Sequence, residues 1–295
     1  MRYSKISLLF YILFFCCSVS GYSQSVWVKK PGEYYTQIGG TYYGYDQVFN
    51  SGNKFLPIRR AVTHVTLQSY SEFGIAKNLM GTAIIPVQIQ STSQKLLPDS
   101  SYIQNPISAG QLVAPGNVQL ALTYGFRQDK AFRLAAKLRF DLRTSLYKAS
   151  VGLRSGESAW GFTPSLLAGY GHKYFFASTE LGYTYRTNGY SMQLSSDTQF
   201  GTCIKGKYYI VLAYNMLFAL APTDYDSQNA ERANVFQTAT YLNNRQYLSP
   251  ALRLGYNIDK NWSLWASAGG LWLAAGQNIG AAMTFNLSIA YKKEK

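Results

Sequence analysis

The charged residues best placed to act on a solute lie in one stretch, 132–143, where they alternate with apolar residues. The odd-numbered positions of this stretch carry Arg133, Lys137, Arg139, Asp141 and Arg143. Guanidinium, ammonium and carboxylate groups on one face either pair with one another or attract ions of opposite charge. The chemistry that this spacing predicts is ion pairing and electrostatic selection.

Residues that could break bonds or hold a metal are scarce in this chain. The sequence has no Walker loop, no G-x-S-x-G, no H-E-x-x-H and no paired cysteines beyond the N-terminus. Its two histidines are His172, in a predicted turn, and His64, at an inward-facing strand position. We therefore predict no enzyme, no metal site and no cofactor.

Composition narrows the class of protein that must position these charges. The chain has 295 residues, a formal charge of +14, 16% aromatic residues and only 14% charged residues, against about 25% in soluble proteins. Disordered chains lack this aromatic content. After the N-terminus no apolar run approaches the roughly 20 residues of a spanning helix. The composition therefore favours β-structure.

A period of two places the charges on one face of a β-strand. In 132–143 the even positions, from Phe132 to Leu142, are apolar. A helix would scatter the charges around its cylinder, whereas a strand separates the two faces completely. The same alternation recurs at 118–126, 175–185, 208–218, 252–256 and 283–291.

Short polar turns alternate with longer joins along the chain. The short turns lie at 76–78, 128–130, 172–173, 205–207 and 259–261, and the joins at 46–60, 92–115, 144–159, 187–191, 220–247 and 274–279. The strands predicted between them are 33–45, 61–75, 79–91, 116–127, 132–143, 160–171, 174–186, 192–204, 208–219, 248–258, 262–273 and 280–292. An even strand number with short turns at one end and long loops at the other describes an all-β protein, a transmembrane antiparallel up-and-down β-barrel of about 12 strands.

A secreted β-sandwich or solenoid would show the same alternation with its apolar rows turned inward. Aromatic residues near the ends of the apolar rows favour the barrel, because they match the interfacial girdles of outer-membrane proteins. The last strand, with Phe285, Leu287, Ile289 and Tyr291 spaced by two, resembles the segment that outer-membrane assembly machinery reads. We expect that machinery and outer-membrane lipid as partners, and no nucleic acid.

The N-terminus predicts export. Arg2 and Lys5 precede an apolar stretch at 8–17 and small residues at 18–23, the pattern of a secretory signal peptide. We expect residues 1–23 to be removed and residues 24–295 to form the barrel in the outer membrane of a Gram-negative bacterium. Since the first strand begins soon after residue 24, there is no room for a plug domain, and transport would be passive.

The inner face of the barrel is the candidate functional site. On the lipid side each Lys or Arg would cost about 2–4 kcal/mol at mid-depth, so charged strand residues should face the lumen. The lumen and selectivity candidates are Glu72, Lys137, Arg139, Asp141, Arg143, Glu180, Asp197 and Arg253. They form either a network of ion pairs that supports the wall or, through Lys137, Arg139 and Arg143, a track that attracts anions.

The size of the barrel and one long loop bear on whether the lumen is open. Barrels of about eight strands are filled by side chains, whereas barrels of about sixteen strands enclose open channels. A barrel of twelve strands should therefore have a narrow lumen. The join at 220–247 is long for a hairpin loop, and such loops are usually functional or mobile. It either folds over or into the mouth or extends outside.

Two stretches resemble a known family. The hairpin from Thr66 to Pro86, with an aromatic residue and Gly before a short turn and a strand ending in Pro, is similar to an early hairpin of the MetA-pathway (phenol degradation) outer-membrane family. The stretch from Ser155 to Tyr170 resembles that family's central loop, whose acidic Gly-rich part is reduced here to Gly156-Glu157. The resemblance covers most of 33–291. It implies an outer-membrane channel for aromatic or other hydrophobic compounds, distantly like long-chain fatty-acid transporters.

The sequence thus predicts a passive channel for small solutes, hydrophobic or aromatic in character. Two alternatives stay open. One is an anion or acidic-sugar porin that uses Lys137, Arg139, Arg143 and Arg253. The other is a closed structural or surface-interaction barrel that works through its external loops without transport.

Overall fold

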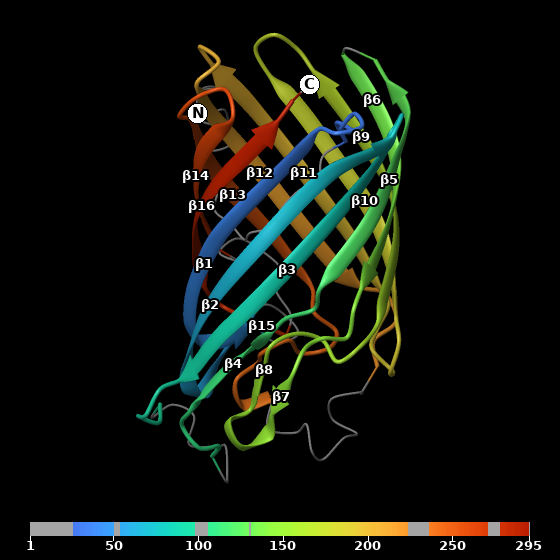
Figure 1. The fold of residues 1–295 in the computed structure, drawn as a ribbon. Coiled ribbons are helices and arrows are strands. Elements are labelled where there is room, and N and C mark those ends of the chain that lie inside the picture. Colours follow the sequence, from blue (N-terminus) through green and yellow to red (C-terminus); the bar gives the residue numbers. More distant parts are fainter. Residues whose placement is uncertain are drawn as a thin grey trace, which may run out of the picture.

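A computed structural model describes residues 26–49, 54–97, 106–129, 131–223, 236–270 and 278–294, so the predicted signal peptide 1–23 lies outside the described residues. Within them, one sheet of fourteen strands closes into an antiparallel barrel (Figure 1). Two of the fourteen are the short β4 and β15, which leaves twelve long strands, as predicted. In chain order these are β1 (Tyr34–Phe49), β2 (Phe55–Ala76), β3 (Leu79–Thr92), β5 (Gln119–Gln128), β6 (Phe132–Asp141), β9 (Gly161–Gly171), β10 (Phe176–Arg186), β11 (Gln193–Ile204), β12 (Tyr208–Ala219), β13 (Tyr247–Asn257), β14 (Trp262–Gly270) and β16 (Met283–Lys293).

The barrel closes because β1 pairs with both β2 and β16. Ile38 of β1 lies opposite Ser69 of β2 on one side and Ile289 of β16 on the other. The two ends of the described chain therefore lie at the same end of the barrel as the short turns (Figure 1). In an outer-membrane barrel this is the periplasmic end.

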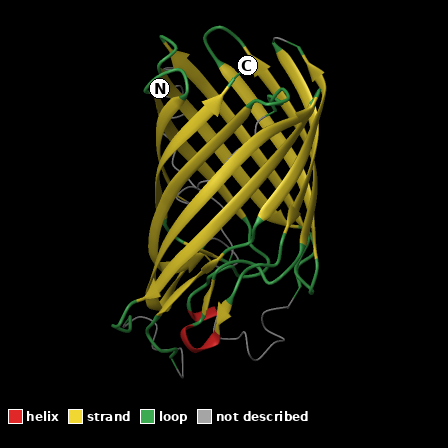
Figure 2. Cartoon of the chain, in the orientation of Figure 1, coloured by secondary structure: helices red, strands yellow, loops and turns green. Residues whose placement is uncertain are grey.

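Short elements gather at the opposite, extracellular end. They are β4 (Gln111–Pro115) on β3, β15 (Ile279–Gly280) on β1, and the hairpin of β7 (Tyr147–Lys148) and β8 (Leu153–Arg154) around the 3-10 helix η2 (Ala149–Val151). Figure 2 shows loops crowding this end, with η2 as a single helical turn. Among the described residues no helix is long and apolar enough to cross a membrane.

The apolar rows face outward, which rules out the soluble sandwich. On β5, Leu122 is 48% exposed whereas its neighbour Thr123 is fully buried. The same reversal holds on β16, where Leu287 is 71% exposed and Ser288 is buried. Polar residues line the inside and apolar ones cover the outside, the arrangement that a lipid bilayer stabilises.

Aromatic side chains mark the periplasmic edge of this apolar surface. Several stack across neighbouring strands, as Tyr34 does with Tyr291 at 5.7 Å between ring centroids and Trp262 with Tyr291 at 4.9 Å. Tyr208 and Tyr256 form a third pair at 5.4 Å. These rings confirm the expected interfacial girdle.

Several strand boundaries differ from the prediction, and two of these differences are described here. The join expected at 46–60 is mostly strand: after a bulge between Tyr45 and Gln47 the β1–β2 ladder continues to the pair Phe49 and Phe55, whose rings lie 4.6 Å apart. The strand expected to end at 143 ends at Asp141, because the chain turns directly after Leu142, where the backbone N–H of Thr144 donates to the carbonyl oxygen of Leu142 at 2.8 Å.

Candidate functional site

An ion pair between Lys137 of β6 and Glu180 of β10 crosses the inner face at mid-depth. Both side chains are buried, and each lies near the middle of its strand. Ser165 of β9, between them in the sheet, is the register partner of Lys137. A buried ammonium without such a partner would be costly, so the pair fixes both side chains against the wall.

Four more charged side chains, two basic and two acidic, lie near this ion pair, and together with it they form what we call the mid-lumen belt. Arg139 contacts Asp141 at 3.3 Å and donates to the hydroxyl of Thr163 at 3.2 Å. Asp197 of β11 lies directly opposite Glu180 in the ladder, and Arg253 of β13 interacts electrostatically with Asp197. The mid-lumen belt is the set Lys137, Arg139, Asp141, Glu180, Asp197 and Arg253. It has three basic and three acidic members and therefore no net charge.

The remaining predicted residues lie away from this belt. Glu72 of β2 is buried near the periplasmic end, where it contacts Lys29 at 3.9 Å and accepts a hydrogen bond from the Tyr70 hydroxyl at 2.6 Å. Arg143 lies two residues beyond the end of β6 and is exposed. The structure thus does not continue a basic row from Lys137 and Arg139 to Arg143.

A polar chamber of about 330 Å³ lies between the mid-lumen belt and the extracellular loops. The belt residues Arg139, Asp141, Glu180 and Asp197 line one side of it. Carboxamides and hydroxyls add to the wall, and the loops contribute Glu157, Tyr241 and Arg245. The chamber is therefore suited to solutes that form hydrogen bonds.

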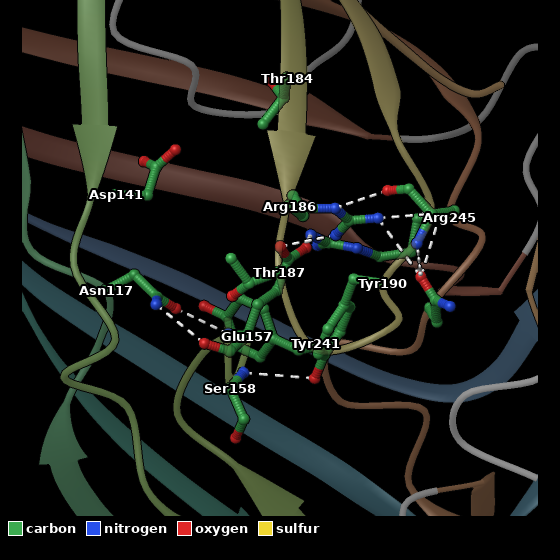
Figure 3. A network of polar contacts seen from close by, with 12 residues as sticks. Asn117, Asp141, Glu157, Ser158, Thr184, Arg186, Thr187, Tyr190, Tyr241 and Arg245 are labelled. Atoms are coloured by element: carbon green, nitrogen blue, oxygen red, sulfur yellow. Dashed lines mark hydrogen bonds and ion pairs between the residues drawn. The ribbon is translucent and has the colours of Figure 1, made fainter. Parts of the chain in front are cut away.

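Glu157 ties the extracellular loops to the barrel wall (Figure 3). One carboxylate oxygen contacts Arg186 of β10 at 2.6 Å, and the other pairs with Arg245, next to β13. The main chain at 157 is held as well, since its N–H donates to Asn117 at 2.6 Å and its carbonyl oxygen accepts from the Asn117 amide at 2.8 Å. We call Glu157, Arg186 and Arg245 the Glu157 latch.

The two arginines outweigh the cost of burying the carboxylate. Burial alone would favour the neutral acid, but Arg186 and Arg245 together lower the pKa of Glu157 from 4.5 to about 2. Burial likewise disfavours the charged form of Arg245, but the negative charge of Glu157 outweighs this effect, so the pKa of Arg245 is raised. The latch is therefore ionised throughout the neutral range.

The segments that the latch holds fill part of the lumen. Val151, Leu153, Ala239 and Leu242, all from extracellular loops, pack in one apolar cluster with inward-facing wall residues such as Tyr45. The described part of the 220–247 join thus folds into the mouth, one of the two expected arrangements. Arg154 is fully buried there and donates to the Tyr190 hydroxyl at 3.0 Å.

At the other end, the segment 26–31 enters the periplasmic mouth. Val26 is buried against Ala135 and Leu167, both on the inner face, and Gln128 donates to its carbonyl oxygen at 3.3 Å. A Cβ at Gly169 would lie 2.3 Å from a methyl carbon of Val26, so a larger residue there would displace the Val26 side chain. This short segment narrows the periplasmic mouth.

An aromatic chamber of about 580 Å³ lies beside this segment. Trp27 lies 6.0 Å from Phe176 in an edge-to-face pair, and Tyr209 lies 5.3 Å from Trp265. Arg253 of the mid-lumen belt also lines this chamber. The lumen thus holds two chambers in series, a polar one on the extracellular side and an aromatic one on the periplasmic side.

Sequence reasoning missed several of these residues. Arg245 and Trp27 lie in segments without strand periodicity. Trp265 faces inward, and this is why 262–273 shows so little alternation. His64 does face inward, as predicted, where it contacts the Tyr43 hydroxyl and the Gln88 amide.

Neither a protein-family model nor a curated protein sequence matches this chain. Among solved structures, the COG4313 outer membrane channel from Pseudomonas putida F1 is similar, with a TM-score of 0.70 at 11% identity over 94% of this chain and 100% of that one. The translocator domain of the autotransporter NalP from Neisseria meningitidis has a TM-score of 0.50 at 10% identity, covering 89% of each chain. The toluene transporter TodX of Pseudomonas putida reaches only 0.45 at 11% identity, over 95% of this chain and 96% of that one. The chain has the β-barrel fold of the COG4313 outer membrane channel, which agrees with the fold that the resemblance noted in its sequence implies.

Proposed function

We propose that this protein is a passive outer-membrane channel for small solutes, hydrophobic or aromatic in character, and not an enzyme. The observation that carries the proposal is the pair of chambers in series along the lumen. A solute that enters from outside would meet the polar chamber, pass the mid-lumen belt and reach the aromatic chamber. We also propose that outer-membrane lipid surrounds the barrel and that the outer-membrane assembly machinery recognises its last strand, β16.

The geometry supports this function better than an anion porin. Lys137 is paired with Glu180 and Arg139 with Asp141, so the basic side chains that would attract anions are already neutralised. Arg143 lies outside the row. A belt without net charge raises the local concentration of neither anions nor cations.

One observation favours a second candidate, a closed barrel without transport. The Glu157 latch holds buried loop segments in the extracellular half of the lumen. If these segments never leave, the barrel would act only through its surface.

Planar-bilayer recordings on the refolded mature protein, with a salt gradient, test the proposal. We expect brief openings of low conductance with little preference between K⁺ and Cl⁻. Uptake of a small aromatic alcohol into proteoliposomes should accompany them. Strong anion preference would support the porin, whereas silence together with no uptake would overturn the channel and favour the closed barrel.

A further inference from the structure

The outer surface of the barrel is hollowed over five neighbouring strands, β1, β16, β14, β13 and β12. The groove has a volume of about 860 Å³, and its lining is almost entirely apolar. Tyr208 and Tyr256, which belong to the periplasmic aromatic girdle, line one end of it. The groove therefore lies in the periplasmic half of the surface that faces lipid. We call it the outer groove.

Two small residues create the hollow. The strand register places Gly40 of β1 and Ala266 of β14 on either side of Leu287 of β16. Leu287 is 71% exposed, because neither neighbour is large enough to cover it. A Cβ at Gly40 would lie 3.5 Å from a methyl carbon of Leu67, an ordinary contact, so packing within the wall does not require glycine there. The hollow lets an acyl chain lie alongside Leu287 and contact the wall on both sides.

Larger side chains border the hollow on its periplasmic side. The next row of outward-facing residues, in register across four strands, consists of Ile38, Ile289, Leu264 and Tyr256. All four line the outer groove. The groove thus ends at the depth of the aromatic girdle, which is where the polar part of a lipid begins.

A basic side chain lies at this end of the outer groove. The Nζ atom of Lys207 is 5.0 Å from the centroid of the Tyr256 ring, and Tyr208 stacks on the same ring at 5.4 Å. Lys207 is exposed, and none of the ion pairs among the described residues involves it. Its ammonium group is therefore available to a lipid headgroup.

The two turns around this end carry an excess of positive charge. The turns at 205–207 and 258–261 contain Lys205, Lys207 and Lys260 against one acid, Asp259, so their net charge is +2. The Asp259 carboxylate accepts hydrogen bonds from backbone N–H groups of its own turn at 2.7 and 2.8 Å. The end of the outer groove is thus complementary in charge to a phosphate group.

We infer that the outer groove holds one anionic phospholipid of the periplasmic leaflet, with an acyl chain alongside Leu287 and its phosphate beside Lys207. The groove opens towards the bilayer, so its occupant comes from the bilayer. The inference rests on the location of the barrel in the outer membrane and is independent of solute transport. The lysine and the hollow together distinguish this lipid from the lipids that cover the rest of the barrel.

A second groove on the same surface provides a matched comparison. It has a volume of about 630 Å³ and is also apolar, and its lining includes Ala136, Tyr124 and Tyr183. Among the described residues no basic side chain lies over either of these two rings. A lipid there would have the acyl contacts without the cation.

Native mass spectrometry of the refolded mature barrel in detergent, titrated with lipid, tests the inference. The probes are phosphatidylglycerol, which is anionic, and phosphatidylethanolamine with the same acyl chains, which is zwitterionic. We expect one molecule of phosphatidylglycerol to bind before any other, about fivefold or more tightly than phosphatidylethanolamine, the effect of one lysine beside an anionic lipid. Equal binding of the two lipids, or gradual binding of several copies without a first tight one, would overturn the inference.

Substitutions at the headgroup end test the role of the lysine. Lys207→Gln should reduce the binding of phosphatidylglycerol to the level of phosphatidylethanolamine. The control is Lys173→Gln, because Lys173 also lies over a tyrosine ring, that of Tyr174 at 5.3 Å, but Tyr174 lines neither groove. Unchanged preference in Lys207→Gln, or an equal loss in Lys173→Gln, would refute the assigned phosphate partner.

Substitutions in the hollow test the position of the acyl chain. Gly40→Leu fills the outer groove and should weaken the first lipid about tenfold or more, since each CH₂ group displaced from an apolar contact weakens binding about fourfold. Ala266→Leu fills it from the other side of Leu287 and serves if Gly40→Leu does not fold. Ala136→Leu, in the second groove, is the control and should leave the first lipid in place. Weakening by Ala136→Leu as strong as by Gly40→Leu would refute the outer groove as the site.

Folding of the barrel into vesicles of phosphatidylcholine separates the site from the location on which it rests. Insertion into these vesicles without a preference for phosphatidylglycerol would keep the membrane location and refute the site. Failure to insert into them would refute both.

Discussion

Replacing Glu157 by Gln should release the extracellular loops. The substitution keeps the size of the side chain but removes the charge that Arg186 and Arg245 share. Arg186 keeps its bonds to Ser191, at 2.7 Å to the carbonyl oxygen and 2.9 Å to the hydroxyl. Arg245 loses its carboxylate, and two buried guanidinium groups are left facing a neutral amide.

The pKa of Glu157 gives the magnitude. Its fall from 4.5 to about 2 corresponds to about 3 kcal/mol, since one pKa unit is about 1.36 kcal/mol. This agrees with the cost of about 3–5 kcal/mol for removing one partner of a buried ion pair. If the latch alone holds the loops, the ratio of closed to open states should fall about a hundredfold in Glu157→Gln.

Two assays read this change. Hydrogen exchange of the amides at 144–160 should become faster in Glu157→Gln, while amides of β5 and β6 stay protected. Single-channel recordings should show longer openings than the wild type. The control is Asp129→Asn, which breaks an ion pair of Asp129 with Arg127 that is more than half exposed and so contributes little.

Unchanged exchange at 144–160 in a folded Glu157→Gln barrel would refute the reasoning. The apolar cluster around Leu153 would then hold the loops without help from the latch. Faster exchange with unchanged conductance would instead show that the substitution releases the loops but that the loops do not block the pathway.

Three further predictions follow from the same contacts. Because the folded pKa of Glu157 lies below its unfolded value, the latch contributes its full stability above about pH 4.5 and loses it as pH falls towards about 2. The protection factors of the amides at 144–160, which are corrected for the pH dependence of intrinsic exchange, should therefore fall towards pH 3 in the wild type and stay constant in Glu157→Gln. Lys137→Gln leaves Glu180 beside Asp197 without its ammonium, so the barrel should lose about 3–5 kcal/mol in denaturant unfolding and the reversal potential should shift towards cation preference; the Lys137→Gln, Glu180→Gln double variant should recover most of the stability. Deleting residues 24–30 should raise single-channel conductance, and unchanged conductance would show that this segment does not narrow the pathway.

The strands could be predicted from the sequence because their signal is local. In a barrel wall every second residue meets lipid, so the run from Phe132 to Phe140 shows its two faces in a dozen residues. The same periodicity placed Lys137, Glu180 and Asp197 on the inner face. Which acid pairs with which base was beyond the sequence, because it depends on the stagger between strands.

The latch could not be predicted, since its members come from segments without periodicity. Glu157 and Arg245 lie in loops, and only the fold brings them to Arg186 at the end of β10. The aromatic chamber was hidden for a different reason. Inward-facing rings such as Trp265 break the alternation of polar and apolar residues, so the aromatic lining of the chamber shows no regular strand pattern in the sequence.

Much of the positive charge in the composition lies outside the mid-lumen belt. The mid-lumen belt is neutral, whereas exposed lysines occupy the periplasmic turns, among them Lys77, Lys173, Lys205, Lys207 and Lys260. At physiological ionic strength the field of an exposed charge is screened over about 8 Å, so these turns act on headgroups and solutes at the exit and hardly on the belt. A net charge of +14 would suggest an anion pore. If the barrel is the channel proposed above, selection inside it would instead arise from short-range contacts with the walls of the polar and aromatic chambers.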